Sequence, residues 1–192
     1  MLDTGTDPTV RHLDAAELEA GLTEILRAPA DGGSVELIAR RPAEGEREVL
    51  EEATLDLVVG LVGDNWSTRG SRRMPDRSAN PAAQLTLMSA RVVDLVAAGE
   101  KERWALAGDQ LYVDFDLTAA NIPPGTRLAV GSAVIEVSDE PHTGCEKFHA
   151  RFGGDAHRFV NTRAHRGLNL RGINARVVEP GVVRRGDAIR KL

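Results

Sequence analysis

Glycine and proline divide the second half of the chain into short segments in which apolar and polar residues alternate. Two of these segments lie in residues 123–137 and meet at Gly131-Ser132, where a glycine at the first central position suits a type II′ hairpin turn. Two more lie in residues 175–189 and meet at Pro180-Gly181, a pair that fits a type II turn. Short alternating strands of this kind predict a β-barrel or a β-sandwich.

The first half of the chain combines helical and extended patterns. In residues 14–26, apolar side chains recur at the spacing of one helical face, and the first turn carries a capping-box pattern. Residues 34–41 then alternate Val35, Leu37 and Ala39 with other residues, which predicts a strand with these three side chains on one face. The chain is therefore expected to be mainly β with α, an α+β fold.

Residues 60–83 lack any periodic pattern and are rich in Gly, Ser, Asn, Pro and Arg. A connection of this length is usually functional or disordered. Its side chains include Arg69, Ser71, Arg72 and Arg73, whose donors suit a phosphate or carboxylate group. The alternative is a solvated loop whose charges only keep it soluble.

Length and charge limit the class of protein. The 192 residues are 42% hydrophobic, enough to bury a core in one domain or in a domain with a small appended part. No apolar run approaches the roughly 18 residues that span a bilayer, and the N-terminus lacks a signal-peptide pattern, so a soluble cytoplasmic protein without a membrane partner is expected. The net charge of −5 argues against a nucleic-acid partner.

The charge is unevenly distributed along the chain. Residues 1–60 hold 14 acidic and 5 basic side chains, whereas residues 147–192 hold 3 acidic and 11 basic ones. The basic C-terminal part could receive an anion, or the two parts could pack together and neutralise each other.

Common nucleotide and hydrolase fingerprints are absent from the sequence. GxGxxG before a helix, GxxxxGK[ST], HExxH and GxSxG do not occur, so no flavin or nicotinamide site is expected. A single cysteine cannot hold an iron–sulfur cluster. Any redox reaction would therefore need electrons from a separate donor protein.

The only cysteine, Cys145, lies in the segment PHTGCEKFHARFGG, residues 141–154. Phe148 and Phe152 follow at i+3 and i+7, so Cys145 would begin the apolar face of a short helix. Backbone N–H groups and the helix dipole at that position favour a thiolate, and His142 and Lys147 add positive charge nearby.

Three interpretations of Cys145 remain open on this pattern. It can be a small core residue beneath Phe148, because unpaired cysteine is among the most buried residue types. It can bind or carry a cofactor atom. It can also form a zinc site with His142 and His149, although the spacing matches no standard zinc motif and a fourth ligand would have to come from His157, His165 or a distant carboxylate.

The chain from about Gln84 to Leu192 resembles the MOSC family, named for the C-terminal domain of molybdenum cofactor sulfurases. Four segments carry the resemblance in the family's order: QLTLMSARVVDLV, YVDFDLTAANIPPGTRLAVGSAVIEV, PHTGCEKF and RGINARVVEPGVVRRGDAI. They contain a strand ending in an acidic or amide residue, a G-x-x-L-x-[IVL]-G hairpin, a single cysteine soon after it, and a final V-x-x-x-G-x-[IV]-x-x-G-D.

The resemblance implies a MOSC-type β-barrel with peripheral helices over residues 61–192. Residues 1–60 would then form an α/β extension packed on the barrel, unless residues 1–192 are one domain. Cys145 should lie on the connection that leaves the strand 133–137 and face a cleft at the barrel mouth, between that connection and the loop 64–77.

The resemblance also implies a cofactor and a reaction. The barrel would bind the molybdenum cofactor (molybdopterin), with Cys145 as the catalytic residue and metal ligand. Asp116, which stands in the place of a family E-N-L triplet, and His142 are candidate cofactor-binding residues. The loop residues Arg69, Ser71, Arg72 and Arg73 are candidates for binding the cofactor phosphate, on the basis of their charge and loop position alone. Family members reduce N-hydroxylated compounds or handle sulfur during cofactor maturation, which implies an oxidoreductase with a small-molecule substrate; the alternative is a non-catalytic barrel that binds a cofactor or small ligand.

Overall fold

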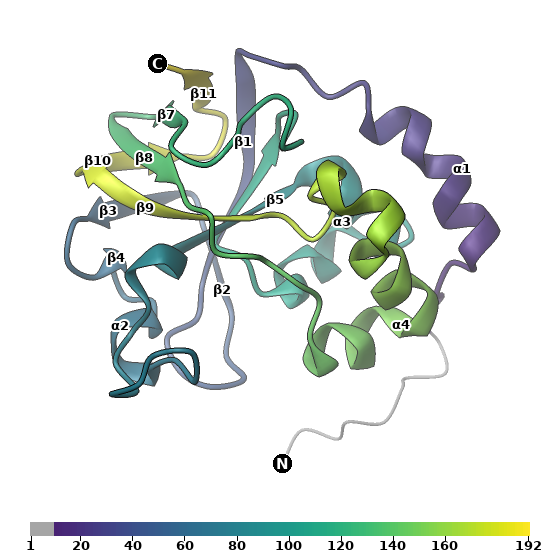
Figure 1. The fold of residues 1–192 in the computed structure, drawn as a ribbon, viewed down its shortest axis with the longest axis horizontal. Helices are drawn as coiled ribbons and strands as arrows, with labels where there is room; N and C mark the ends of the chain where they lie inside the picture. Colours follow the sequence, from purple (N-terminus) through teal and green to yellow (C-terminus); the bar gives the residue numbers. More distant parts are fainter. Residues whose placement is uncertain (1–9) are drawn as a thin grey trace.

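The alternating segments form strands that close on themselves, as the computed structural model of residues 10–192 shows (Figure 1). Every neighbouring pair in this barrel is antiparallel except β5 and β6, which are parallel. The α+β barrel predicted from the sequence is confirmed. Around the barrel the seven strands follow the order β1 (Gly33–Arg40), β6 (Leu111–Asp114), β5 (Leu85–Ser89), β9 (Ile173–Glu179), β8 (Ala133–Val137), β7 (Arg127–Val130) and β11 (Ala188–Lys191).

The two predicted turns have different consequences. β7 and β8 pair as a hairpin across Gly131, in agreement with the predicted turn. The φ of Gly131 is 57°, a backbone conformation that would be strained in a residue with a side chain. After Pro180, by contrast, the chain leaves the barrel. β10 (Gly181–Arg184) pairs with β3 (Glu52–Asp56), which also pairs with β4 (Gly60–Leu61), so these three strands form a separate small sheet.

Strand β1 is irregular, and the prediction that Val35, Leu37 and Ala39 share one face is wrong. The pairing register with β6 shifts between Val35 and Leu37, where a bulge turns the following side chains over. Val35 and Ile38 therefore pack inside the barrel, whereas Leu37 and Ala39 pack against the helices outside it. From Ile38 onward the strand also pairs with β2 (Glu48–Leu50).

Helices cover one side of the barrel (Figure 1, right). The predicted first helix is α1 (Ala15–Ile25), and its capping box between Asp14 and Glu17 is confirmed. A second apolar core, including Tyr112 and Phe148, lies between the barrel wall and the helices. The other helical elements are α2 (Trp66–Arg69), α3 (Ala90–Val96), α4 (Glu146–Asn161) and the 3₁₀ helices η1 (Pro81–Ala83), η2 (Lys101–Ala107) and η3 (Arg163–Leu168).

The part of the chain before residue 61 is interleaved with the rest. β1 closes the barrel between β6 and β11, and β3 pairs with β10 from the C-terminal part. The boundary expected at residue 60 therefore coincides with no break in the hydrogen-bonded sheets.

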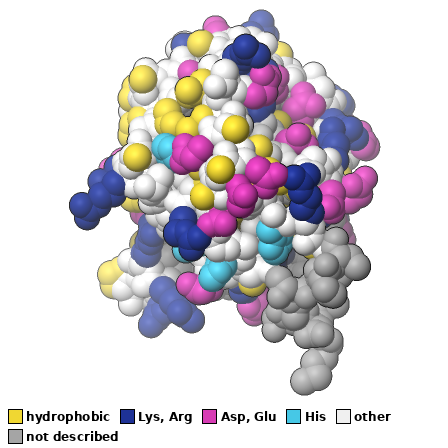
Figure 2. Space-filling model, turned by 90° about the vertical axis from the view of Figure 1, so that its right-hand side faces the viewer, with side chains coloured by type: hydrophobic (Ala, Val, Ile, Leu, Met, Phe, Trp, Pro, Cys, Tyr) yellow, Lys and Arg dark blue, Asp and Glu magenta, His cyan; other side chains and the backbone are white. Residues whose placement is uncertain are grey.

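Ion pairs join the acidic and basic parts of the chain. Glu44 pairs with Lys147, and Glu52 pairs with Arg184. The helical face in Figure 2 shows acidic and basic side chains intermixed, with no single sign prevailing. Within residues 10–192, no helix is long and apolar enough to cross a bilayer.

Candidate functional site

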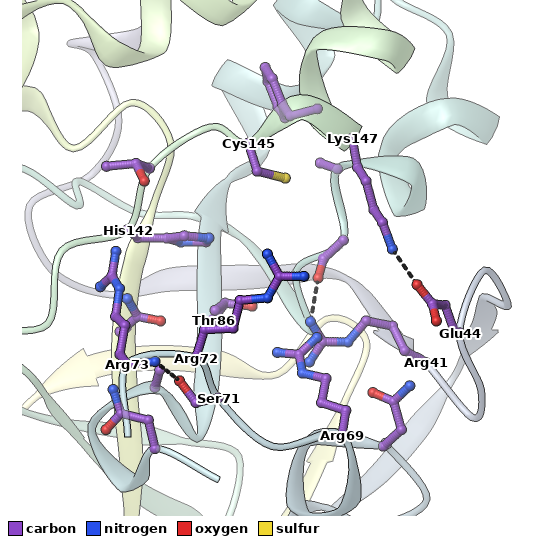
Figure 3. Close-up of a pocket in the computed structure, with 18 of the residues that line it drawn as sticks. Arg41, Glu44, Arg69, Ser71, Arg72, Arg73, Thr86, His142, Cys145 and Lys147 are labelled. Atoms are coloured by element: carbon purple, nitrogen blue, oxygen red, sulfur yellow. Dashed lines mark hydrogen bonds and ion pairs between the residues drawn. The ribbon is translucent and has the colours of Figure 1, made fainter. Parts of the chain in front are cut away.

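A cavity of about 770 Å³ opens where the connection between β8 and α4 faces residues 64–77, the Arg-rich loop (Figure 3). Small-molecule sites typically occupy roughly 300–1,000 Å³. Cys145 and His142 line it from the connection, and Arg69, Arg72 and Arg73 line it from the loop. The sequence predicted this cleft and the position of Cys145 on its wall.

Cys145 stands at the start of α4 with its side chain exposed. Its extended backbone (φ −101°, ψ 177°) is that of an N-cap residue, but its sulfur makes no capping hydrogen bond. The helix therefore leaves the thiol available to a ligand. The interpretation of Cys145 as a core residue is wrong, because Phe148 and Phe152 fill the core instead.

The helical segment that begins after Cys145 is short, as predicted, because α4 is interrupted at Gly153, and a buried cation packs against its first turn. Arg171 lies 5.1 Å from the centre of the Phe148 ring, in the first turn of α4. Its Nη1 donates to Oδ2 of Asp109 at 2.6 Å, and both side chains are almost fully buried. Further along, α4 breaks at Gly153, where φ is 86°.

His142 lies on the cavity wall below Cys145 (Figure 3). Its Nδ1 is 3.6 Å from Oδ1 of Asp109, and both atoms are buried without a hydrogen-bond partner in the described part of the chain. Burial, and after it the charges of Arg171, Arg41 and other cavity arginines, lowers the pKa of His142 well below 6.5. His142 is therefore a neutral imidazole at neutral pH, and the expectation that it adds positive charge beside Cys145 is wrong.

A zinc site around Cys145 lacks ligands in this geometry. His149 stacks on His157, with 5.4 Å between ring centres. Among residues 10–192, no group of three His, Cys, Asp or Glu side chains is close enough to hold a metal. A metal ion at Cys145 would need its remaining ligands from a bound molecule rather than from these residues.

The Arg-rich loop is fixed to the barrel at its start. Asp64 accepts two hydrogen bonds from the Arg41 guanidinium, both at 2.9 Å, and another from the N–H of Trp66 in α2. Burial alone would raise the pKa of Asp64, but these hydrogen bonds and the charge of Arg41 outweigh it and lower the pKa. This buried ion pair fixes the position of α2 and thereby places Arg69 at the cavity.

The remaining loop residues lie along the opposite part of the cavity. Arg73 forms an ion pair with Glu140 and donates to the carbonyl oxygen of Pro141 at 3.3 Å, while Ser71 Oγ accepts from the N–H of Arg73. In Figure 3, Arg73 lies near His142, Arg69 lies near Arg41, and Arg72 extends between them. Arg69 and Arg73 therefore do not converge on a single point.

The cavity is strongly basic. Its lining contains two acidic side chains, Glu44 and Glu140, against nine basic ones: Arg41, Arg47, Arg69, Arg72, Arg73, Arg77, Lys147, Arg151 and Arg171. The sequence pattern did not identify Arg41, Arg47, Arg151 or Arg171, because these arginines are scattered through elements far apart in the chain. Together, the basic side chains give the cavity an excess of positive charge, which suits an anionic ligand.

Asp116 lies outside this cavity, contrary to the prediction for it. Its carboxylate accepts a hydrogen bond from the N–H of Thr118, and its own N–H donates to the carbonyl oxygen of Pro29. It thus stabilises the turn after β6, and its side chain is not part of the basic lining.

Comparison with known proteins decides the family. The family model described as MOSC domain matches residues 74–190, which is more than half of the chain. The chain belongs to the MOSC domain family. Among curated proteins, no sequence matches this MOSC protein significantly.

Solved structures share the MOSC fold at low sequence identity. The YuaD protein from Bacillus subtilis is 18% identical, with a TM-score of 0.58 over 82% of this chain and 93% of its own. YiiM from Escherichia coli is 19% identical, with a TM-score of 0.51 over 83% of this chain and 69% of its own. At these identities the comparison supports the fold alone.

Proposed function

We propose that this MOSC protein binds a molybdenum-pterin cofactor in the basic cavity through Cys145 and reduces N-hydroxylated small molecules. The observation that carries the proposal is an exposed sulfur, free of helix capping, on the wall of a ligand-sized basic cavity. A thiolate is a suitable ligand for a soft metal centre, and the donor set around Cys145 suits a metal that arrives with its other ligands.

Three residues of the loop would hold the anionic part of the cofactor. Ser71, Arg72 and Arg73 offer hydroxyl and guanidinium donors along one part of the cavity. Charge-assisted hydrogen bonds of this kind are about twice as strong as neutral ones. His142, neutral and close by, offers a ring nitrogen for a hydrogen bond to the bound group.

When bound, the cofactor would supply the two-electron chemistry, and the protein would supply orientation and access. Reduction of an N–OH group to N–H with release of water consumes two electrons and two protons. Electrons would come from a separate donor protein, because the sequence has no flavin or nicotinamide fingerprint and only one cysteine.

Elemental analysis tests the proposal directly. Protein made in a host that synthesises the cofactor should contain about one equivalent of molybdenum, as one thiolate ligand implies. Cys145→Ser should lose most of it, whereas Thr143→Val, a change in the same wall without a proposed ligand role, should retain it. One equivalent of zinc, lost in His142→Ala, would contradict the proposal in favour of a zinc site.

A second measurement separates catalysis from cofactor carriage. The molybdenum-loaded protein should reduce an N-hydroxylated amidine with an artificial electron donor, and Cys145→Ser should not. Full molybdenum content without reduction would instead indicate a carrier or ligand-binding barrel.

A further inference from the structure

The geometry points to a second anion subsite in the cavity, formed by Arg41, Arg47, Arg69 and Arg151. Resting on the proposed function, this subsite would bind an acidic group of the substrate itself. The substrates would then be small N-hydroxylated molecules that also carry a phosphate or a carboxylate.

The backbone at the end of η2 gathers these arginines. The carbonyl oxygen of Leu106 accepts from Arg151 Nη1 at 2.7 Å, and that of Gly108 accepts from Arg41 Nη1 at 2.9 Å. A Cβ atom at Gly108 would lie 3.5 Å from Arg47 Nη2. Carbonyl groups at a helix C-terminus attract cations, which explains why guanidinium groups from the connection between β1 and β2 and from α4 meet there.

These contacts leave most of the positive charge uncompensated. Among residues 10–192, Arg41 has a carboxylate partner in Asp64, but Arg47, Arg69 and Arg151 form no ion pair. Within residues 10–192, Arg47 donates only to the carbonyl oxygen of Glu46, and its buried Nε has no partner. Like charges held together without a counter-charge repel one another, and an anionic group would relieve that repulsion.

The charges of these arginines act on one another. Desolvation, and after it the charges of Arg151 and Arg41, lowers the pKa of Arg47. Desolvation and the charge of Arg41 likewise lower the pKa of Arg69, although Arg69 as a whole residue is exposed.

The subsite lies apart from Ser71 and Arg73, two of the residues proposed for the cofactor, and Arg72 extends between the two groups. In Figure 3, Arg69 and Arg41 lie together near the Lys147–Glu44 ion pair, whereas Arg73 lies on the other side near His142. A single phosphate is satisfied by a few convergent donors. Basic groups at both ends of the cavity therefore fit two anionic groups, with Cys145 on the wall between them.

Direct binding to the protein, as purified from a cofactor-competent host, tests the subsite. By calorimetry, benzyl phosphate should bind at least about tenfold more tightly than benzyl alcohol, since a charge-assisted hydrogen bond contributes about a factor of ten or more. The double variant Arg47→Gln/Arg151→Gln should weaken benzyl phosphate binding about tenfold or more and leave the molybdenum content unchanged. Arg163→Gln, an exposed arginine outside the cavity lining, should change neither property.

Two results would overturn the inference. One is equal affinity for the phosphate and the alcohol. The other is loss of molybdenum from the Arg47/Arg151 double variant, which would assign these arginines to the cofactor. Failure of the proposed function looks different: wild-type protein would lack molybdenum, while the preference for benzyl phosphate and its dependence on Arg47 and Arg151 would persist.

Discussion

The side-chain amide of Asn161 binds both polar groups of Gly144. Its Oδ1 accepts the N–H of Gly144 at 2.9 Å, and its Nδ2 donates to the carbonyl oxygen of Gly144 at 3.1 Å. Nε2 of His157 lies 3.0 Å from the same carbonyl oxygen. The last turn of α4 thus fixes the residue that directly precedes Cys145 at the start of that helix.

Asn161→Ala should release this segment. The loss of two solvent-accessible hydrogen bonds should lower the free energy of unfolding by about 1 kcal/mol. Molybdenum content should fall as well, because the sulfur would no longer be held in place against the cavity. Urea unfolding and elemental analysis check both effects; unchanged values for both would show that Gly144 is positioned without this contact.

Arg171→Met should be strongly destabilising, because it leaves Asp109 buried without its counter-charge. Breaking a buried pair in this way costs about 3–5 kcal/mol. Burial raises the pKa of Asp109 even beside Arg171, and without that counter-charge the folded-state pKa would lie still further above the unfolded value. The loss should therefore be smaller at low pH, where Asp109 takes up a proton, and larger as the pH rises through the folded pKa.

Urea unfolding of Arg171→Met across a pH series measures this effect. The paired variant Arg171→Met/Asp109→Leu, which removes both charges, should recover much of the stability. Equal stability of the single and double variants at neutral pH would contradict an uncompensated Asp109 as the cause.

His142 should make stability depend on pH. Its pKa is lowered in the folded state, so below the unfolded value of about 6.5 the unfolded chain binds a proton that the folded chain does not. Stability should therefore fall as the pH falls below about 6.5, by up to ~1.4 kcal/mol per pH unit until the folded pKa is reached. His142→Gln should show a shallower decrease in urea unfolding over that range, and an identical slope would show that His142 does not titrate differently in the two states.

Arg47→Gln should stabilise the ligand-free protein. It removes a partly desolvated charge that has no ion pair and is repelled by Arg151 and Arg41. A gain of a few tenths to about 1 kcal/mol is expected, since residues placed for binding often lower the stability of the free protein. The melting temperature measures the change, with Arg163→Gln as the control. A clear loss of stability would mean that Arg47 stabilises the fold and is not placed for ligand binding.

Local patterns in the sequence determined the elements and the position of the thiol. Period-2 alternation predicted the β7–β8 hairpin, and the capping box with a helical stripe predicted α1. The spacing of Phe148 and Phe152 predicted that Cys145 begins a helix, as it does. Each of these features is set by the backbone geometry of neighbouring residues, so a short stretch of sequence records it.

Only the tertiary structure decided which of these elements meet. The bulge in β1 and the departure of β10 into a second sheet depend on non-local strand pairing, so the periodicity of the sequence predicts neither of them. The same holds for the approach of Arg41, Arg47 and Arg151 to the end of η2 and of His142 to Asp109, between residues tens of positions apart. Sequence periodicity predicts on which face of its own strand or helix a side chain lies. The long-range packing of barrel and helices, in contrast, brings the polar groups into one cavity.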